Sequence, residues 1–399
     1  LWNGARQLAA IQLYVQDLPG SYVDAPHLLR TLQEMWSASS PPLLISPQSR
    51  QLLLQLLQQA PRGSPWIEVR GQWLGDSSLL EQVRQAYRRG LRLVWRGELS
   101  DLPGGDIAAC FDNSLLSLSP AEAVGALQSS ASTGQRGVRA SPILDGQMYE
   151  NLPTVALLSL CLDRHRAVAV AGWPSDDVLY SLRHQQLQPS HATIFKLMKA
   201  IDAEQSLDSF EHILSEDPLL AYRFLTYTNS AALGLRTGID SLRRGLVMLG
   251  YGTLQRWLGD QLPHASTDPN LSPIRQTMVL RAQLMERLVE AGIEYELRRE
   301  VYLTGLLSQL DTLMDEPIAT ILRRLPLSER ISDAIVLRSG PYAPALQIAC
   351  ALETDDASVV RQLCETHEMD TESVNRALLR LLSELHVERP RPGQPTGSR

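Results

Sequence analysis

The hydrophobic pattern of this chain changes part-way along it, and this change restricts the possible folds more than any other feature. Up to about residue 187, short apolar runs alternate with amphipathic stretches, which predicts alternating strands and helices. From residue 188 to 387 only helical periodicity remains. The sequence therefore predicts an α/β domain over 1–187 and an all-helical domain over 188–387. Residues 388–399 are rich in Pro and Gly, so we expect a disordered tail there.

Short apolar runs predict six strands in the first domain: Ile11–Val15, Leu43–Ile45, Trp66–Val69, Leu91–Trp95, Ile107–Phe111 and Ala167–Ala171. Helical patterns separate several of them, at Pro26–Trp36, Pro47–Gln59, Ser77–Arg89 and Pro120–Ser129. Strands spaced by helices pair in parallel with right-handed crossovers. An incomplete or distorted (β/α) barrel fits this order best, and an open doubly wound sheet is the alternative.

Composition narrows the classes of function. The chain has 399 residues and a formal net charge of −7, which argues against a surface that binds nucleic acid throughout. No uninterrupted apolar run is long enough to cross a membrane. The four cysteines lie far apart, as free thiols of a reducing compartment do. The chain opens at Leu1 without signal-peptide features, as a trimmed or partial sequence would. We expect a cytoplasmic protein without cofactor, nucleic-acid partner or membrane partner.

Two segments of the second domain carry a family resemblance. Residues 215–231 read SEDPLLAYRFLTYTNSA, and residues 239–250 read IDSLRRGLVMLG. Together they resemble the opening of the HDOD domain, a helical signalling relative of the HD-type metal phosphohydrolases. The individual residue types also suit helix starts and stops. We therefore interpret the following as a structural HDOD signature: Asp217, Pro218, Asn229, Ser230 and Gly250.

The metal ligands of catalytic HD relatives are missing from this chain. Residues 301–314, VYLTGLLSQLDTLM, resemble the segment that carries the His-Asp pair in those relatives, and here Ser308 and Gln309 stand at the two ligand positions. Neither binds a first-row metal as imidazole and carboxylate do. Residues 278–288, where an upstream His is expected, contain none. The sequence predicts no hydrolysis by this domain.

The first domain resembles a degenerate EAL domain. The EAL domain is the barrel that hydrolyses cyclic di-GMP with two metal ions. The run AIQLYVQD resembles the first strand of that family, with Gln12 in place of a metal-binding Glu. The run WIEVRG resembles a strand with a second carboxylate, and Glu68 is retained. In GLRLVWRGE, paired aspartates of the family are replaced by Arg96 and Gly97.

Two further strands of the EAL pattern have also lost their functional residues. The run DIAACF places Ala109 and Phe111 at a Lys and an Asp of the family, and RASPIL places Ser141 at a Glu. Two-metal hydrolysis needs several converging carboxylates. One retained Glu beside an arginine does not meet this need, so we predict neither a metal site nor catalytic residues.

Five residues near strand ends are candidate contacts for a ligand or a partner at the barrel mouth: Glu68, Arg70, Trp73, Trp95 and Arg96. The guanidinium of Arg96 suits an anion. The alternative is an arginine in solvent or paired with Glu98. The tryptophans suit a stacking platform or a protein contact, or they fill the space between barrel and helices.

Two dismantled metal sites in a chain that keeps its fold-forming residues predict a non-catalytic bacterial signalling adaptor of the EAL–HDOD, YuxH-like type. Its two domains would recognise unidentified signalling proteins, as a monomer or as a homodimer. The alternative is a receptor that binds cyclic di-GMP without hydrolysing it. An active phosphodiesterase or phosphohydrolase is the least favoured hypothesis.

Overall fold

The computed structural model describes residues 1–17, 24–131, 141–233, 238–289 and 295–387. The chain divides into two compact units. The first, here called the sheet domain, comprises Leu1–Asp177 and the described residues after Leu381; the second, the helical domain, is Val178–Leu381. The sequence-based boundary at 187/188 falls later in the chain than this division. The expected disordered tail, 388–399, lies outside the described residues.

The sheet domain is built on seven parallel strands: β1 (Ile11–Val15), β2 (Leu43–Pro47), β3 (Trp66–Arg70), β4 (Leu93–Glu98), β5 (Asn113–Ser117), β6 (Met148–Glu150) and β7 (Ala169–Ala171). Each strand pairs with the next one in sequence, so the spatial order runs from β1 to β7. A doubly wound sheet instead reverses its strand order at a switch point. The sequential order confirms barrel-type winding and excludes the doubly wound alternative.

The first two residues join the two edges of this curved sheet. Trp2 exchanges backbone hydrogen bonds with Val170 of β7, at 2.9 and 2.8 Å, as an antiparallel bridge. Leu1 pairs with the residues just before β1: its nitrogen donates to the Ala10 carbonyl at 2.9 Å, and its carbonyl accepts from Ala9 at 2.8 Å. The amino-terminal segment thus hydrogen-bonds to both edges of the sheet.

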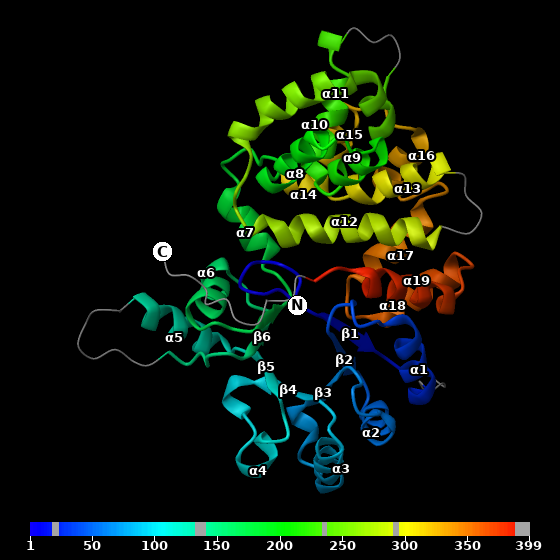
Figure 1. Cartoon of the computed structure of the whole chain (residues 1–399). Helices are drawn as coiled ribbons and strands as arrows, with labels where there is room; N and C mark the ends of the chain where they lie inside the picture. Colours follow the sequence, from blue (N-terminus) through cyan, green and yellow to red (C-terminus); the bar gives the residue numbers. More distant parts are fainter. Residues whose placement is uncertain (18–23, 132–140, 234–237, 290–294, 388–399) are drawn as a thin grey trace. The chain divides into compact units, whose positions relative to one another are not determined.

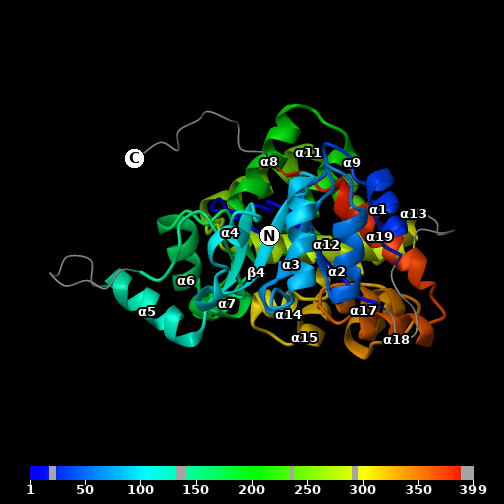
Figure 2. The same ribbon diagram turned by 90° about the horizontal axis from the view of Figure 1, so that it is seen from below.

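Alternation along the strands separates an inner from an outer core. Leu44, Val94 and Leu115 point inward and form one apolar layer with residues of the other strands. Trp95 and Leu116 point outward and pack under the covering segments. The helices of this domain follow the strands in turn: α1 (Ala25–Met35), α2 (Arg50–Gln59), α3 (Ser77–Arg88), α4 (Gly105–Ala108), α5 (Pro120–Ala131) and α6 (Val155–Ser159) (Figure 1). Helices α2 and α3 pack side by side (Figure 2).

The prediction of a strand at Ile107–Phe111 is wrong. Residues 105–108 form the helical turn α4, and β5 begins at Asn113. A short apolar run does not by itself distinguish a strand from a helical turn. The three-residue strand β6, Met148–Glu150, was missed because it is too short to show a pattern.

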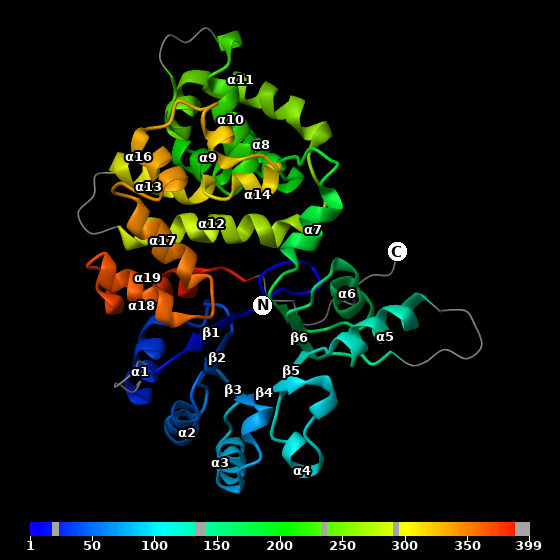
Figure 3. The same ribbon diagram turned by 180° about the vertical axis from the view of Figure 1, so that it is seen from behind.

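The helical domain consists of helices with one isolated β-bridge, between Ser190 and Ser266, among its described residues. Its helices are α7 (Ser175–Leu182, which begins just before the domain), α8 (His191–Asp202), α9 (Leu207–Leu214), α10 (Pro218–Thr228), α11 (Leu242–Gln261), α12 (Leu271–Leu288), α13 (Tyr295–Leu307), α14 (Leu310–Met314), α15 (Ile318–Leu322), α16 (Glu329–Ser332), α17 (Ala343–Leu352), α18 (Ala357–Thr366) and α19 (Thr371–Glu384) (Figure 3). Serine or aspartate side chains accept a backbone N–H at several helix starts, which satisfies donors without a helical partner: Ser190, Ser206, Asp217, Ser241 and Asp356.

Helices α12 and α13 pack closely against each other. A Cβ added at Gly305 of α13 would lie 2.6 Å from the Cα of Ala282 in α12. The small residue therefore lets the two backbones touch. In the described part of the chain, no helix is both long and apolar enough to cross a membrane.

Candidate functional site

A polar layer lies above the apolar interior of the sheet domain, toward the carboxyl ends of the strands. In barrels of parallel strands this is the end that carries binding and catalytic groups. The strands contribute polar side chains two residues beyond the inward apolar ones, since alternate residues share a face. We call these residues the strand-end cluster: Gln12, Tyr14, Ser46, Glu68, Arg70, Arg96 and Glu150.

Arg96 lies between two buried carboxylates. Its Nε donates to Glu150 Oε1 at 3.0 Å, and its Nη2 lies 2.8 Å from Glu150 Oε2. Its Nη1 donates to Glu68 Oε1 at 3.2 Å. Burial alone would lower the pKa of Arg96, but the hydrogen bond to Glu150 and the charges of both glutamates outweigh it and raise that pKa. The expected alternative partner, Glu98, is not the one that Arg96 contacts.

Glu68 is fully buried and is held on its other oxygen by neutral donors. Ser46 Oγ donates to Glu68 Oε2 at 2.5 Å, and Gln12 Nε2 donates to the same oxygen at 3.0 Å. The residue expected in place of a metal ligand, Gln12, therefore hydrogen-bonds to the retained carboxylate. Within the part of the chain that the structure describes, no group of three or more His, Cys, Asp or Glu side chains lies close enough to hold a metal ion.

Two arginine–aromatic pairs lie at the outer edge of the cluster. The guanidinium carbon of Arg70 lies 5.2 Å from the ring centre of Trp73, and that of Arg96 lies 5.7 Å from the ring of Tyr14. Arg70 also donates to Gln48. Its Nε is buried without a hydrogen-bond partner among the described residues, since Glu68 Oε1 is 3.6 Å away. Glu68, Arg70, Trp73 and Arg96 thus lie close together.

Trp95 lies elsewhere. Its side chain is 1% exposed and packs in the outer core, on the opposite face of β4 from Arg96. Cβ atoms added at Gly71 and Gly97 would lie 2.8 and 2.7 Å from its indole ring, so both glycines make room for it. Trp95 fills space between sheet and helices, which corrects its prediction as a contact at the barrel mouth.

Glu150 and Tyr14 were missed by the sequence analysis. Glu150 is far from Arg96 in the chain and ends a strand of three residues. Ser141, the residue placed at a family Glu, lies outside the strands. The only sequence signal for Glu150 is its place directly after the apolar pair Met148–Tyr149, which is weak.

In the helical domain, Asp217 is fully buried and contacts two segments. Its Oδ1 accepts from the backbone N–H groups of Leu219 and Leu220, at 2.9 and 3.1 Å, and so caps α10, which begins at Pro218. Its Oδ2 accepts from the Ser190 N–H at 2.6 Å. The capping geometry connects the starts of α8 and α10.

The other signature residues also lie at breaks between helices. The side chain of Asn229 accepts from the Ile239 N–H at 2.7 Å and donates to the Ile239 carbonyl at 2.8 Å. Ser230 follows it, with its hydroxyl buried and without a hydrogen bond among the described residues. Gly250 has φ of 67° inside α11, a conformation that suits glycine, and divides that helix at a kink.

A second buried arginine lies beside the positions where the HD resemblance expects metal ligands. Arg281 Nε donates to Glu353 Oε1 at 2.6 Å, and its Nη2 donates to Oε2 at 2.5 Å. Its Nη1 donates to Ser308 Oγ at 3.1 Å. With its amide oxygen turned toward the arginine, Gln309 accepts from Nη2 at 2.8 Å. Burial alone would lower the pKa of Arg281, but the bond to Glu353 raises it overall.

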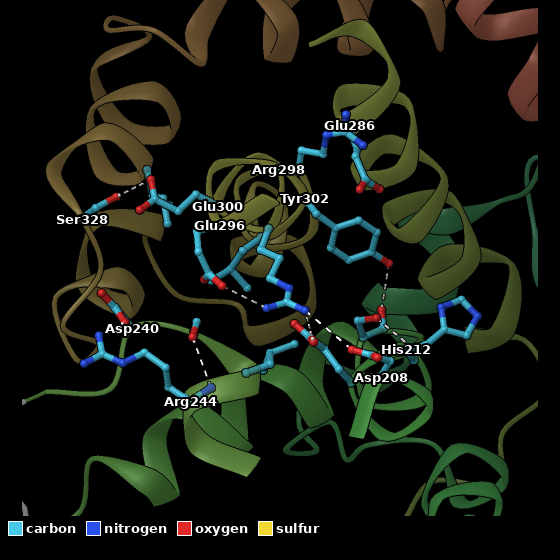
Figure 4. A pocket seen from close by; sticks show the side chains of 17 residues that line it. Asp208, His212, Asp240, Arg244, Glu286, Glu296, Arg298, Glu300, Tyr302 and Ser328 are labelled. Atoms are coloured by element: carbon cyan, nitrogen blue, oxygen red, sulfur yellow. Dashed lines mark hydrogen bonds and ion pairs between the residues drawn. The ribbon is translucent and has the colours of Figure 1, made fainter. Parts of the chain in front are cut away.

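A cavity of about 360 Å³, with many charged residues in its lining, lies among α9, the start of α11, the end of α12, α13 and α16 (Figure 4). Arg299 lies 3.0 Å from Glu211. Glu300 accepts from Arg330 and from the Tyr342 hydroxyl, at 2.9 and 2.8 Å. Burial alone would raise the pKa of Glu300, but these bonds lower it overall. The lining charges thus form pairs of opposite sign, which do not single out a class of ligand.

The HDOD domain family model matches residues 187–314. This stretch is an HDOD domain. The match confirms the resemblance read from the two signature segments, and it ends before α15. The EAL resemblance of the sheet domain is not part of this match.

Two curated bacterial proteins are similar to the chain. Cyclic di-GMP phosphodiesterase CdgJ of Vibrio cholerae is 24% identical over 200 residues, which cover 50% of this chain and 46% of the relative. The uncharacterized protein YuxH of Bacillus subtilis is 22% identical over 200 residues, which cover 48% of this chain and 47% of the relative. The matches span about half the length of these curated relatives.

Among solved structures, the MmoQ response regulator of Methylococcus capsulatus aligns with a TM-score of 0.39 and 16% identity, over 48% of this chain and 98% of that one. A similarity at this level supports no conclusion about function. CdgJ, by contrast, bears on the sequence-based expectation that the chain is not an enzyme. The name of that relative points to enzymatic activity and contradicts the expectation.

Proposed function

We propose that this protein acts in cyclic di-GMP signalling and that its strand-end cluster binds the dinucleotide. The similarity to a protein named as a cyclic di-GMP phosphodiesterase, in a chain with an HDOD domain, carries this proposal. The sequential winding of the parallel strands supports the further proposal that the sheet domain is a diverged EAL-type barrel.

The chemistry of the cluster suits this ligand. A cyclic dinucleotide presents two phosphates and two purine bases. Arg70 and Arg96 provide two guanidinium groups, which bind phosphate oxygens well. Trp73 and Tyr14 lie beside them and offer rings on which bases can stack. The buried Nε of Arg70, which lacks a hydrogen-bond partner among the described residues, is a donor that a ligand oxygen could satisfy.

The EAL-type resemblance implies metal ions at the strand ends, but the residues present do not fit a two-metal centre. The two buried carboxylates, Glu68 and Glu150, both contact the guanidinium of Arg96. A cation placed between them would meet that positive charge at close range. We therefore derive no step through a metal ion and assign the recognition of phosphate to the arginines.

Calorimetric titration of cyclic di-GMP into the full chain, with and without Mg²⁺, tests the proposal. We expect saturable binding that Arg70→Ala weakens by about ten- to a hundredfold, because a charged hydrogen bond is worth about 1.5–3 kcal/mol. Arg92→Ala is the matched control, since Arg92 also lies over a tryptophan, Trp66, at 5.4 Å but at the other end of the strands. Absence of saturable heat would contradict the proposal.

The same samples are assayed for conversion of cyclic di-GMP to its linear product. Turnover together with binding makes the dinucleotide a substrate, whereas binding alone makes it a regulatory ligand. Both results support a role in cyclic di-GMP signalling. The presence or absence of turnover decides whether the dinucleotide is a substrate or a regulatory ligand.

The helical domain has a surface that suits a protein partner. Val247, Met248 and Tyr251 on α11, within the HDOD match, have 63%, 58% and 52% exposure. Val247 and Met248 precede the kink at Gly250, and Tyr251 follows it. Exposed apolar side chains that form a patch are characteristic of interaction sites. We propose recognition of a signalling protein there. A partner protein that the full chain captures in the presence of cyclic di-GMP should not be captured by the Met248→Glu variant. This result would support the proposal.

A further inference from the structure

Five arginines gather at the amino-terminal ends of β3 and β4, away from the strand-end cluster. We call this surface the basic face; its members are Arg62, Arg84, Arg88, Arg89 and Arg92. Arg84 and Arg88 lie one helical turn apart on α3, so they share one side of that helix. Arg92 directly precedes β4, and Arg62 lies between α2 and β3. Figures 1 and 2 show α2 and α3 as neighbours.

Contacts join the end of α2 to the loop after α3 and place Arg62 and Arg89 near each other. Arg89 donates to the Gln58 carbonyl at 2.6 Å and to the Leu57 carbonyl, at the end of α2. Atoms of the Arg62 side chain lie 3.4–3.5 Å from a Cβ built at Gly90, the residue after Arg89. The surface therefore continues from the end of α2 across the loop that follows α3.

The positive charge of the basic face is largely uncompensated. Among the described residues, the ion pairs of these arginines involve a single carboxylate, Glu81, which lies 4.0 Å from both Arg84 and Arg88. Asp106 and Asp112, which lie on α4 and just before β5, form no described ion pair with the basic face. The side chain of Arg88 is 71% exposed. The basic face therefore combines five guanidinium groups with one carboxylate, although the whole chain has a net charge of −7.

We propose that the basic face binds an acidic segment of a partner protein. Guanidinium groups pair with carboxylates through two parallel hydrogen bonds. Two aromatic side chains beside the arginines add apolar contact area of the kind that protein interfaces use: Tyr87, which is 44% exposed, and Trp66, under Arg92. The binding of cyclic di-GMP at the other strand ends plays no part in this inference.

The overall charge of the chain favours a short acidic segment over an extended polyanion. Nucleic acid or an anionic membrane presents negative charge well beyond five arginines and would meet a chain that is negative overall. An acidic peptide segment can match the size of the basic face and end where the positive charge ends. The favourable interaction then falls with added salt, because exposed charges are screened.

A fluorescein-labelled peptide of ten glutamates, titrated with the full chain in 50 mM NaCl and followed by anisotropy, tests the inference. We expect saturable binding that Arg84→Glu/Arg88→Glu weakens by about tenfold or more, since two attractive contacts become repulsive. The matched control is Arg361→Glu/Arg376→Glu, which reverses two helical arginines of the helical domain, each paired with a glutamate one turn away. Arg88→Gln adds a milder variant, and circular dichroism checks that every variant is folded.

Loss of peptide binding in the α3 variants alone, with a steep decrease at higher salt, supports the inference. No saturable binding by the unmodified chain overturns it, as does an equal loss in the control variant. A single-stranded DNA oligonucleotide and phosphatidylglycerol vesicles serve as competing probes. Tighter binding of either probe than of the peptide, lost in the α3 variants, overturns the assignment to an acidic protein segment.

Discussion

The side chain of Arg96 compensates the negative charge of two buried carboxylates. Glu68 and Glu150 lie on different strands, and each is almost fully buried. Two carboxylates in such a place repel each other and lose their hydration, unless a cation and hydrogen-bond donors compensate. Arg96 contacts both of them, while Ser46 and Gln12 donate to Glu68. The polar layer is stable because its charges are paired.

Arg96→Ala should lower the free energy of unfolding by about 3–5 kcal/mol at pH 7, because it leaves two buried carboxylates without their cation. Urea denaturation of the variant and of the unmodified chain at pH 7 measures this difference.

Arg376→Ala provides the control for this prediction. Arg376 also contacts a glutamate, Glu372, at 2.7 Å, but both side chains are exposed. Exposed pairs contribute about 0–1 kcal/mol. An equal loss in both variants would show that Arg96 does not neutralise the buried carboxylates.

At the scale of elements, the α12–α13 pair depends on one small residue. Gly305 faces the backbone of Ala282, and a Cβ there would meet the Ala282 Cα at 2.6 Å. Backbone cannot move aside as the end of a flexible side chain can. Helix propensity would favour alanine at such a position, so close packing opposes intrinsic preference here.

Gly305→Ala should therefore destabilise the helical domain by about 1–3 kcal/mol, the usual cost of overpacking. Gly259→Ala is the matched variant, because Gly259 lies in α11 with no atom within 4 Å of an added Cβ. That substitution should stabilise by about 0.5–1 kcal/mol. Thermal unfolding of both variants measures the contrast, and a stabilising effect of Gly305→Ala would contradict the packing argument.

At the scale of the whole molecule, the helical domain extends beyond its family match. The match ends at residue 314, whereas the compact unit continues to Leu381. Arg281 of α12 reaches Glu353 after α17, and Leu288 packs against a cluster formed by α17, α18 and α19. The helices after residue 314 thus pack against α12 and complete the core on that side of it.

A fragment of residues 187–314 should not unfold cooperatively, because it exposes one face of α12 and leaves the buried Arg281 without its carboxylate partner. A fragment of residues 175–384, which keeps α7 and α19 whole, should melt cooperatively. Circular dichroism on heating compares the two. A cooperative transition of the shorter fragment would show that the helices after residue 314 are dispensable.

Much of the architecture could be predicted from the chain alone. The strands at Ile11–Val15 and Trp66–Val69 match β1 and β3 closely, because apolar periodicity and β-branched residues are local properties. The helical signature around Asp217 was recognised from its resemblance to the HDOD family. The prediction of a strand at Ile107–Phe111 was wrong, since the start of this apolar run belongs to a helical turn.

The sequence by itself determined the change from α/β to all-helical structure, because this change depends on local hydrophobic patterns, and a family resemblance identified the HDOD segment. Only the tertiary structure decided that the strands pair in sequential order, that Arg96 pairs with Glu150 and Arg281 with Glu353, and that Trp95 lies in the core. These partners are far apart in the chain. Their pairing depends on strand register and helix packing, which bring charges together across distances that no local pattern records.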